Sequence, residues 1–256
     1  MSSSADTLAR ALDGAAAELL AASLGVPRVD LYASVTSTLD VAHAIAATAP
    51  SGTLVVADEQ RSGRGTHGRS WTSPPGTGLW LTLIERPADA RAIDVLSLRC
   101  GLLAAEALEP LARAPVGVKW PNDLYVGGRK LAGVLIETRW RGATPEWVAI
   151  GVGLNVVAPP LETAAGLAAG STRLGALARL VPALRHAAAC TGRLTHDELA
   201  RWRARDVAHG RTAVTPSPGR VEGISAAGEL LVRAGDGTLA AHRTGSLTFA
   251  EPLPCS

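Results

Sequence analysis

Residues 116–157 read VGVKWPNDLYVGGRKLAGVLIETRWRGATPEWVAIGVGLNVV, and this stretch decides the fold class. Apolar and β-branched residues form segments in direct succession, at 116–120, 124–126, 131–138 and 147–157. Such segments are typical of strands, and Gly127-Gly128 favours a hairpin turn between the second and the third. Because no helical pattern separates the strands, strict βαβ alternation is excluded and a mixed sheet is predicted.

Helical patterns flank this stretch on both sides. Apolar periodicity and capping signals predict helices at 8–24, from Thr36 or Ser37 to about 48, at 92–112, at 172–190 and from a capping box at 195–198. Further strands are predicted at 29–33, 53–57 and 79–84, with a polar, glycine-rich loop at 59–78. The fold class is therefore α+β, with helices packed on one face of a mixed sheet.

The sequence changes in character at Gly210. Short strand patterns broken by glycines follow, at 211–215, 220–225, 229–233 and 238–242. This spacing predicts a small C-terminal β-barrel. The chain is thereby divided into an N-terminal helical extension at 1–28, a main domain at 29–209 and the small barrel at 210–256.

Composition excludes several classes of protein. A chain of 256 residues that is 47% hydrophobic can bury a sizeable core. With 19% charged residues and a formal net charge of +2, it has no strong electrostatic attraction to nucleic acid or to an anionic membrane. No stretch approaches the ~20 apolar residues that cross a bilayer. Cys100, Cys190 and Cys255 are too scattered for a disulfide framework or a zinc site, and they fit a reducing compartment, so a cytoplasmic protein is predicted.

The glycine-rich segment GRGTHGRSW at 63–71 fits the dinucleotide-binding pattern G-x-G-x-x-G and almost fits a P-loop. Both sites need a helix directly after the glycines, and the sequence SWTSPPGTG at 70–78 excludes one. The segment still suits an anionic ligand, because glycines expose backbone N–H groups and Arg64 and Arg69 can pair with oxygens. Trp71 could cover an apolar ligand. A solvated surface loop is the alternative.

Two further clusters carry polar groups at unusual positions. In KWPND at 119–123, a lysine, an amide and a carboxylate share a stiff turn, which suits an anion, its metal ion and a proton acceptor. A β-bulge with solvated charges is the alternative. Lys130 opens the next strand, and GVGLN at 151–155 ends an apolar strand with glycines that mark close approach of a ligand or of backbone.

Together and in this order, the motifs resemble those of the biotin–protein ligases. The matching motifs are GRGTHGRSW at 63–71, KWPNDLYV at 119–126, RKLAGVLIE at 129–137 and GVGLN at 151–155. The resemblance covers about residues 29–250. It implies a class II synthetase-like biotin ligase catalytic domain at 29–209 and an SH3-like β-barrel at 210–256. Because only 28 residues precede the first strand, a monofunctional ligase without a DNA-binding domain is expected.

The resemblance also implies an activity. Such enzymes are ligases that activate biotin with MgATP to biotinyl-5′-AMP, release pyrophosphate and transfer the biotinyl group to one lysine of a biotin carboxyl carrier protein. Biotin and ATP are therefore the expected substrates, Mg²⁺ the expected cofactor and the carrier protein the expected partner. No nucleic-acid or membrane partner is expected, and a homodimer is a guess from the family.

The resemblance assigns the site residues one by one. The implied biotin site consists of Ser37, Thr38, Leu39, Gln60, Gly63, Arg64, Gly65, Thr66, Trp71 and Lys130. The implied ATP site consists of Arg64, Arg69, Lys119, Asn122, Asp123, Lys130, Gly151, Gly153 and Asn155. Catalytic roles fall to Lys130, Arg64, Lys119 and Asp123, and Asp123 is also the implied metal ligand.

Two positions depart from the family pattern. Leu39 stands where the family usually has asparagine, and Thr66 stands where it usually has a basic residue. Thr66 leaves the loop with one cation fewer, so faster escape of the reactive adenylate is expected. Two alternatives remain at this point: a lipoate or octanoate ligase or transferase of the same superfamily, and a non-catalytic biotin- or nucleotide-binding protein.

Overall fold

A computed structural model describes residues 6–253. Its helices are α1 (Ala17–Leu24), α2 (Thr38–Ile45), α3 (Ala90–Ala112), α4 (Arg173–Ala189) and α5 (His196–Arg205), with a 3₁₀ turn η1 (Thr66–Gly68). The strands of the first part are β1 (Thr7–Leu8), β2 (Ala11–Leu12), β3 (Ala15–Ala16), β4 (Val29–Val35), β5 (Thr53–Arg64), β6 (Ser70–Ser73), β7 (Gly78–Glu85), β8 (Gly117–Lys119), β9 (Asp123–Val126), β10 (Arg129–Arg141) and β11 (Thr144–Asn155). The C-terminal strands are β12 (Thr212–Thr215), β13 (Gly219–Ile224), β14 (Leu230–Arg233), β15 (Leu239–His242) and β16 (Thr248–Phe249).

The main sheet is mixed, as predicted. Its strand order is β1-β4-β5-β7-β11-β10-β9-β8, with β6 paired to β5. Strands β4 and β5 run parallel, whereas β8 to β11 form an antiparallel meander. The predicted hairpin at Gly127-Gly128 joins β9 to β10, and both glycines have positive φ angles, 53° and 71°. This is the conformation that a two-residue hairpin turn requires.

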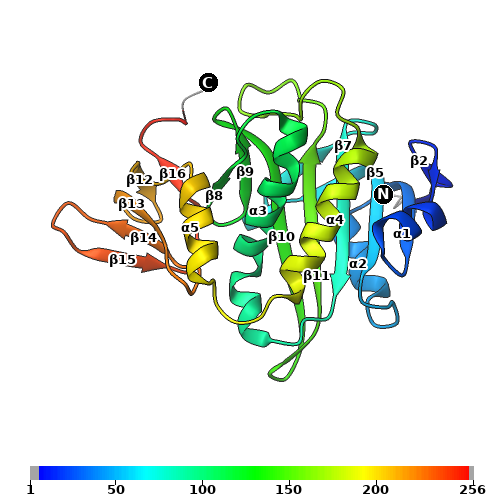
Figure 1. Ribbon diagram of the computed structural model, residues 1–256, viewed down its shortest axis with the longest axis horizontal. Helices are drawn as coiled ribbons and strands as arrows, with labels where there is room; N and C mark the ends of the chain where they lie inside the picture. Colours follow the sequence, from blue (N-terminus) through cyan, green and yellow to red (C-terminus); the bar gives the residue numbers. More distant parts are fainter. Residues whose placement is uncertain (1–5, 254–256) are drawn as a thin grey trace.

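Helices cover both faces of the sheet, and not one face as predicted. The long helices α3 and α4 lie side by side across one face (Figure 1). Helix α2 packs on the opposite face, where it forms a separate small core with Val55 and Ala57 of β5. Along β5 the alternate residues Leu54 and Val56 belong to the other core. A strand buried on both faces reads as continuously apolar, so its sequence does not say which helix covers which face.

The predicted helix at 8–24 is wrong in its first half. Only 17–24 is helical, while β2 and β3 form a hairpin and β1 pairs with β4 at the edge of the main sheet. Asp13 and Gly14 have positive φ angles, 48° and 84°. A tight turn at these two residues breaks the helical periodicity that the leucines suggest.

The predicted loop at 59–78 is also largely wrong. Strand β5 continues to Arg64, η1 reverses the chain, and β6 returns along β5 with Gly63 opposite Trp71. A Cβ atom at position 63 would collide with the carbonyl oxygen of Trp71, so only glycine permits this pairing. The predicted absence of an α-helix after the glycines is confirmed.

The C-terminal strands form their own five-stranded sheet, in the order β15-β14-β13-β12-β16. This small β domain lies at the end of the molecule beside α5 and β8 (Figure 1). Strand β16 does not appear among the predicted strands, and no pairing between β15 and β16 closes a barrel within residues 6–253.

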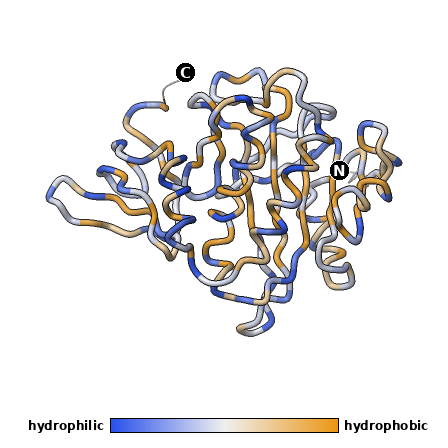
Figure 2. Tube along the Cα trace, in the orientation of Figure 1, coloured by the Kyte–Doolittle hydropathy of each residue, from blue (hydrophilic) through white to orange (hydrophobic). Residues whose placement is uncertain are grey.

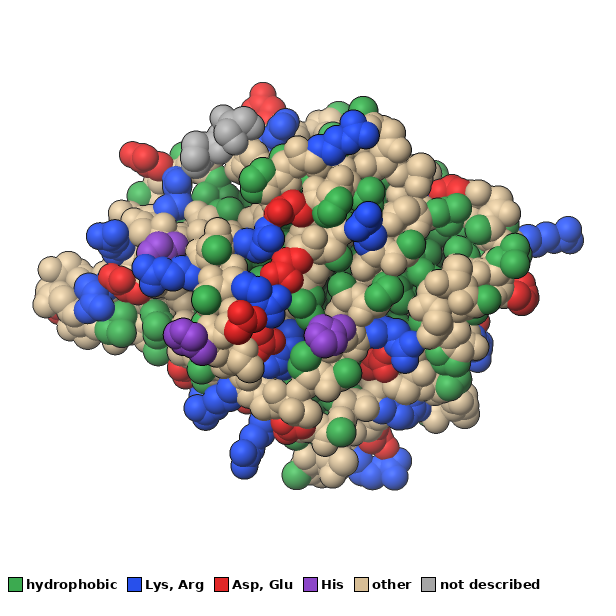
Figure 3. Space-filling model, viewed as in Figure 1, with side chains coloured by type: hydrophobic (Ala, Val, Ile, Leu, Met, Phe, Trp, Pro, Cys, Tyr) green, Lys and Arg blue, Asp and Glu red, His purple; other side chains and the backbone are tan. Residues whose placement is uncertain are grey.

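The apolar and charged residues are distributed as the composition suggests. The central strands are largely hydrophobic, and the β10–β11 turn is polar (Figure 2). Charges of both signs are interspersed over the face in view (Figure 3), in keeping with a net charge of +2. No helix of the described chain is long and apolar enough to cross a membrane.

Candidate functional site

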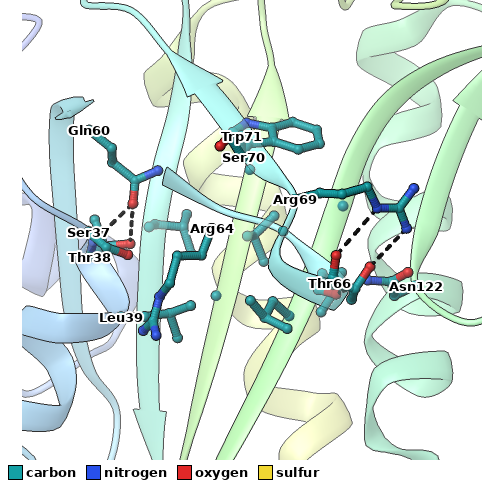
Figure 4. A pocket seen from close by; sticks show the side chains of 18 of the residues that line it. Ser37, Thr38, Leu39, Gln60, Arg64, Thr66, Arg69, Ser70, Trp71 and Asn122 are labelled. Carbon is teal, nitrogen blue, oxygen red and sulfur yellow. Dashed lines mark hydrogen bonds between the residues drawn. The ribbon is translucent and has the colours of Figure 1, made fainter. Parts of the chain in front are cut away.

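A cavity of about 240 Å³ lies over the main sheet, on the face that carries α2 (Figure 4). Its lining comes from the start of α2, the β5–β6 hairpin, the β8–β9 turn and the strands β7, β10 and β11. The sequence-predicted residues that line it are Ser37, Thr38, Leu39, Gln60, Arg64, Gly65, Thr66, Arg69, Trp71, Asn122, Asp123, Lys130, Gly151 and Gly153. Segments from positions 37 to 153 therefore meet in one cavity.

One end of the cavity is polar. The side-chain oxygen of Gln60 accepts hydrogen bonds from the backbone N–H (2.9 Å) and the hydroxyl (3.2 Å) of Thr38. Thr82 donates its hydroxyl to Thr38 at 2.9 Å, and the Gln60 amide donates to Ser73 at 2.9 Å. These contacts hold Thr38 and Gln60 in fixed orientations. Such preorganised polar groups are what orient a ligand in a mostly apolar pocket.

Ser37 lies at the start of α2 and lines the same polar end of the cavity. It is the N-cap residue of α2, but its side chain makes no capping hydrogen bond. The residue is only 1% exposed, and its hydroxyl oxygen has no hydrogen-bond partner. A buried hydroxyl without a partner costs free energy, because it has lost its water and gained nothing in exchange. The Ser37 hydroxyl is therefore available for a polar group of a ligand.

The middle of the cavity is apolar and is shaped by two glycines of β11. A Cβ atom on Gly153 would lie 2.6 Å from the indole ring of Trp71, and one on Gly151 would lie 3.1 Å from Leu39. Trp71 and Leu39 can pack directly on the strand because these positions lack side chains. This close approach is what a glycine within a strand predicts.

The other end of the cavity carries charge. The Lys130 ammonium group lies 2.6 Å from a carboxylate oxygen of Asp123 and 5.1 Å from the ring centroid of Trp71. Asn122 is buried and donates its amide to the backbone oxygen of Val134 at 2.7 Å. The Asn122 amide thus fixes the turn that carries Asp123. An ammonium group at this end can neutralise a ligand carboxylate or phosphate.

Arg64 is held by acids that the sequence analysis missed. Its guanidinium group lies 3.0 Å from Asp40 on α2 and 3.4 Å from Glu137 on β10. Glu137 in turn lies 2.8 Å from Nε2 of His43, and the Trp147 indole donates to Nδ1 of His43 at 3.1 Å. Because an indole N–H only donates, Nδ1 of His43 accepts, and Nε2 carries the proton that bonds Glu137. Asp40, His43 and Trp147 lie outside the motifs and Glu137 ends the motif at 129–137, so only proximity in space shows that they form one network with Arg64.

Arg69 reaches the residue that departs from the family pattern. Its guanidinium group donates to the backbone oxygen of Thr66 at 3.3 Å and to the Thr66 hydroxyl at 3.2 Å. It also lies 3.5 Å from the hydroxyl of Ser246 in the C-terminal domain. A cation therefore lies beside Thr66 even though position 66 is uncharged.

The predicted residues Gly63, Lys119 and Asn155 do not line this cavity. Gly63 lines an adjacent hollow along the β5–β6 hairpin. Asn155 is buried and donates to the backbone oxygen of Ala165 at 3.1 Å, which ties the loop after β11 to the sheet. Lys119 points into a separate groove, where burial lowers its pKa.

The lining also includes residues that the sequence analysis did not select, namely Ser70, Leu81, Gly133, Val134, Leu135 and Val152. Leu81 has no local signal, because only the strand order brings β7 between β5 and β11. Gly133 carried a signal within the motif at 129–137. Within residues 6–253, no three His, Cys, Asp or Glu side chains are arranged to hold a metal ion.

The fold and the site define a class: an α+β domain with a cavity that is polar at one end and carries an ammonium group at the other, which suits a small organic ligand with a polar head and an anionic end. Residues 31–155 match the sequence profile of the Biotin/lipoate A/B protein ligase family. This segment belongs to that family, and within it the chain is similar to biotin ligases.

The curated relatives support this assignment. Over an aligned segment of 152 residues, the chain is 36% identical to the Biotin--[acetyl-CoA-carboxylase] ligase of Mycobacterium tuberculosis. The segment covers 57% of this chain and 55% of that protein. Over 113 aligned residues, it is 41% identical to the Bifunctional ligase/repressor BirA of Escherichia coli. These residues cover 44% of this chain and 35% of that protein. The matched segment thus spans from about a third to about half of these relatives' length.

Solved structures extend the likeness to most of the fold. The biotin protein ligase from Aquifex aeolicus in complex with biotin and ATP superimposes with a TM-score of 0.68 at 25% identity. The match covers 87% of this chain and 99% of that one. The biotin protein ligase from Leishmania major in complex with biotinyl-5-AMP gives a TM-score of 0.58 at 29% identity, covering 84% and 98%.

Proposed function

We propose that this chain is an ATP-dependent biotin–protein ligase, which forms biotinyl-5′-AMP and transfers biotin to a lysine of a biotin carboxyl carrier protein. The observation that carries this proposal is the pairing of chemistries at the two ends of one cavity. The unpartnered Ser37 hydroxyl and the fixed Thr38–Gln60 pair suit the ureido ring of biotin. Lys130 suits its carboxylate at the opposite end.

In the first step, the biotin carboxylate attacks the α-phosphorus of ATP and pyrophosphate leaves. Two anions must approach each other, so cations are needed to cancel their repulsion and to stabilise the pentacoordinate transition state. Lys130 bridges carboxylate and phosphate in this proposal. Arg64 and Arg69, on the β5–β6 hairpin, add positive charge once ligand oxygens compete with Asp40 and Glu137 for Arg64.

In the second step, the carrier lysine attacks the acyl carbon and AMP leaves. The attacking amine must lose a proton, and Asp123 is the carboxylate at the charged end of the cavity. Its pairing with Lys130 holds it in place to orient the amine or accept the proton. Among the described residues that line the cavity, Asp123 is the one carboxylate, and it would hold the Mg²⁺ of MgATP together with the phosphates and water.

The alternative functions make different demands on the cavity. A lipoate or octanoate enzyme needs a long apolar tunnel, whereas the Ser37–Thr38–Gln60 end is polar. A non-catalytic binding protein has no need of Lys130 and Asp123 at hydrogen-bonding distance.

Cys100 and Cys190 are free, which supports a reducing compartment and hence a cytoplasmic location. A homodimer remains a prediction from the family resemblance.

The test is ATP–pyrophosphate exchange with biotin, lipoate or octanoate as the acid, followed by labelling of a carrier domain. Exchange with biotin alone, and transfer to the carrier lysine, is the expected result. Exchange sustained by lipoate or octanoate would assign the chain to the other branch. Biotin binding without exchange would identify a binding protein.

A further inference from the structure

A second groove, of about 420 Å³, lies between the main sheet and the C-terminal domain. Lys119 and Tyr125 line one side, and residues 247–249 and 251–253 line the other. Lys119 lies opposite Asp123 in the β8–β9 ladder, so its charge is close to the charged end of the first cavity.

Phe249, the one phenylalanine in the sequence, connects Lys119 to the C-terminal domain. The Lys119 ammonium group lies 5.3 Å from the ring centroid of Phe249 and 5.6 Å from that of Tyr125. Arg211 lies 5.2 Å from the same Phe249 ring and donates hydrogen bonds to the backbone oxygens of Glu251 and Pro252. Arg211 therefore fixes the segment that carries Phe249.

The aromatic surroundings of Lys119 differ in kind from the acidic partner of Lys130. Lys130 is paired with Asp123 at 2.6 Å, but no carboxylate within residues 6–253 lies within 4.0 Å of the Lys119 ammonium. An aromatic face attracts a cation through its quadrupole and adds no negative charge. Phe249 and Tyr125 thus hold the Lys119 side chain without pairing its ammonium group with a carboxylate.

We propose that Phe249 is a positioning residue of the active site. From the C-terminal domain it holds the Lys119 ammonium group in the second groove, on the strand pair that carries Asp123, where that charge binds the phosphates of ATP. The Arg69–Ser246 contact brings a second cation of the site to the same C-terminal segment. The proposal rests on the proposed function, and it makes the C-terminal domain part of the nucleotide site.

The test compares KM for ATP with KM for biotin in pyrophosphate exchange. Phe249→Leu keeps an apolar side chain and removes the ring, and it is expected to raise KM for ATP by about 3- to 30-fold, the range from an exposed to a desolvated cation–π contact. KM for biotin should change less than twofold. Phe249→Tyr keeps the aromatic face and is expected to restore KM for ATP.

Leu230→Val is the matched control, because Leu230 is buried in the same domain and is not among the groove residues. The proposal is overturned if Phe249→Leu leaves KM for ATP unchanged, if both KM values rise together, or if Leu230→Val has the same effect. If Phe249→Leu does not fold, Phe249→Tyr and Phe249→Trp replace it. The proposal is supported if Phe249→Tyr has the wild-type KM for both substrates and Phe249→Trp changes KM for ATP but not KM for biotin. It is refuted if each of these variants changes KM for ATP and KM for biotin by the same factor. A wild-type chain without any exchange would instead contradict the proposed function.

Discussion

At the scale of single residues, Lys130 is expected to matter most for the first step. Lys130→Ala removes the ammonium group that neutralises carboxylate and α-phosphate, an interaction made mainly in the transition state. The expected loss in biotin-dependent pyrophosphate exchange is roughly 10²- to 10³-fold, or about 2.7–4 kcal/mol. Arg129→Ala is the control, since Arg129 is the exposed cation beside it. Near-normal exchange in a folded Lys130→Ala protein would remove Lys130 from the mechanism.

The contacts of Arg69 alter the expectation that the uncharged Thr66 lets the adenylate escape faster. Because its guanidinium group bonds Thr66 and lies in the cavity lining, it supplies the cation that position 66 lacks. Arg69→Ala should therefore speed the release of biotinyl-5′-AMP by roughly 10- to 150-fold, the equivalent of one charge-assisted hydrogen bond of about 1.5–3 kcal/mol.

The measurement is the release rate of the adenylate, together with labelling of a bystander protein without a carrier motif. Thr66→Arg introduced into Arg69→Ala should restore retention, because it returns a cation to the same place. If Arg69→Ala retains the adenylate as well as the wild type does, other residues close the loop and this assignment is wrong.

At the scale of elements, the glycines of β11 determine where Trp71 can lie, because they carry no side chains. Gly153→Ala places a methyl group 2.6 Å from the Trp71 ring. The ring must move away, and overpacking of this kind costs about 1–3 kcal/mol. We expect a lower midpoint of urea unfolding and weaker biotin binding by calorimetry. Gly235→Ala should change neither, because a Cβ atom there meets open space. If Gly153→Ala binds biotin as tightly as the wild type does, the position of Trp71 does not shape the biotin site.

At the scale of the whole molecule, the N-terminal segment is part of the core. Leu12, Leu20 and Leu24 are buried, and Asp13 pairs with Arg173, which also pairs with Asp58. Deleting residues 1–26 would uncover these apolar side chains and remove a partner of a largely buried arginine. We expect the truncated chain to be insoluble or to unfold at much lower urea concentration. A truncated chain with wild-type stability in urea would contradict this role.

Asp206 makes the junction between the two domains sensitive to pH. It ends α5 and bridges to Val118 of β8, and burial raises its pKa from the ordinary 3.8 to about 6. The folded protein therefore binds a proton more tightly than the unfolded chain, and stability falls as pH rises from about 4 to about 6. A shift of this size corresponds to about 3 kcal/mol.

Asp206→Asn should remove that loss, because an amide cannot ionise and can still accept the hydrogen bond from the Ala208 N–H. In urea unfolding, the variant is expected to exceed the wild type above pH 7 and to match it below pH 4. Equal stability of the two proteins across this range would show that Asp206 titrates normally.

Much of the site follows from local sequence. The residues of GRGTHGRSW, KWPND and KLAG that line the cavity were identified from glycines, turn formers and charges within short motifs. Motif chemistry is local, because a glycine that admits a close approach or a turn that holds a carboxylate needs only its own neighbours in the chain. The antiparallel meander of β8 to β11 is local for the same reason, since short turns join its strands.

Other features depended on pairing between distant segments. Glu137 meets His43 and Arg64 across 94 and 73 positions, and Lys119 meets Phe249 from another domain. Sheet order and register decide such contacts, and no local pattern encodes them. The end of β5 follows the same rule. Its polar, glycine-containing sequence has low strand propensity, and it forms a strand because it pairs with β6. Short motifs and the family resemblance thus indicated the candidate ligand-binding groups, while packing between remote elements decided which charges hold them in place.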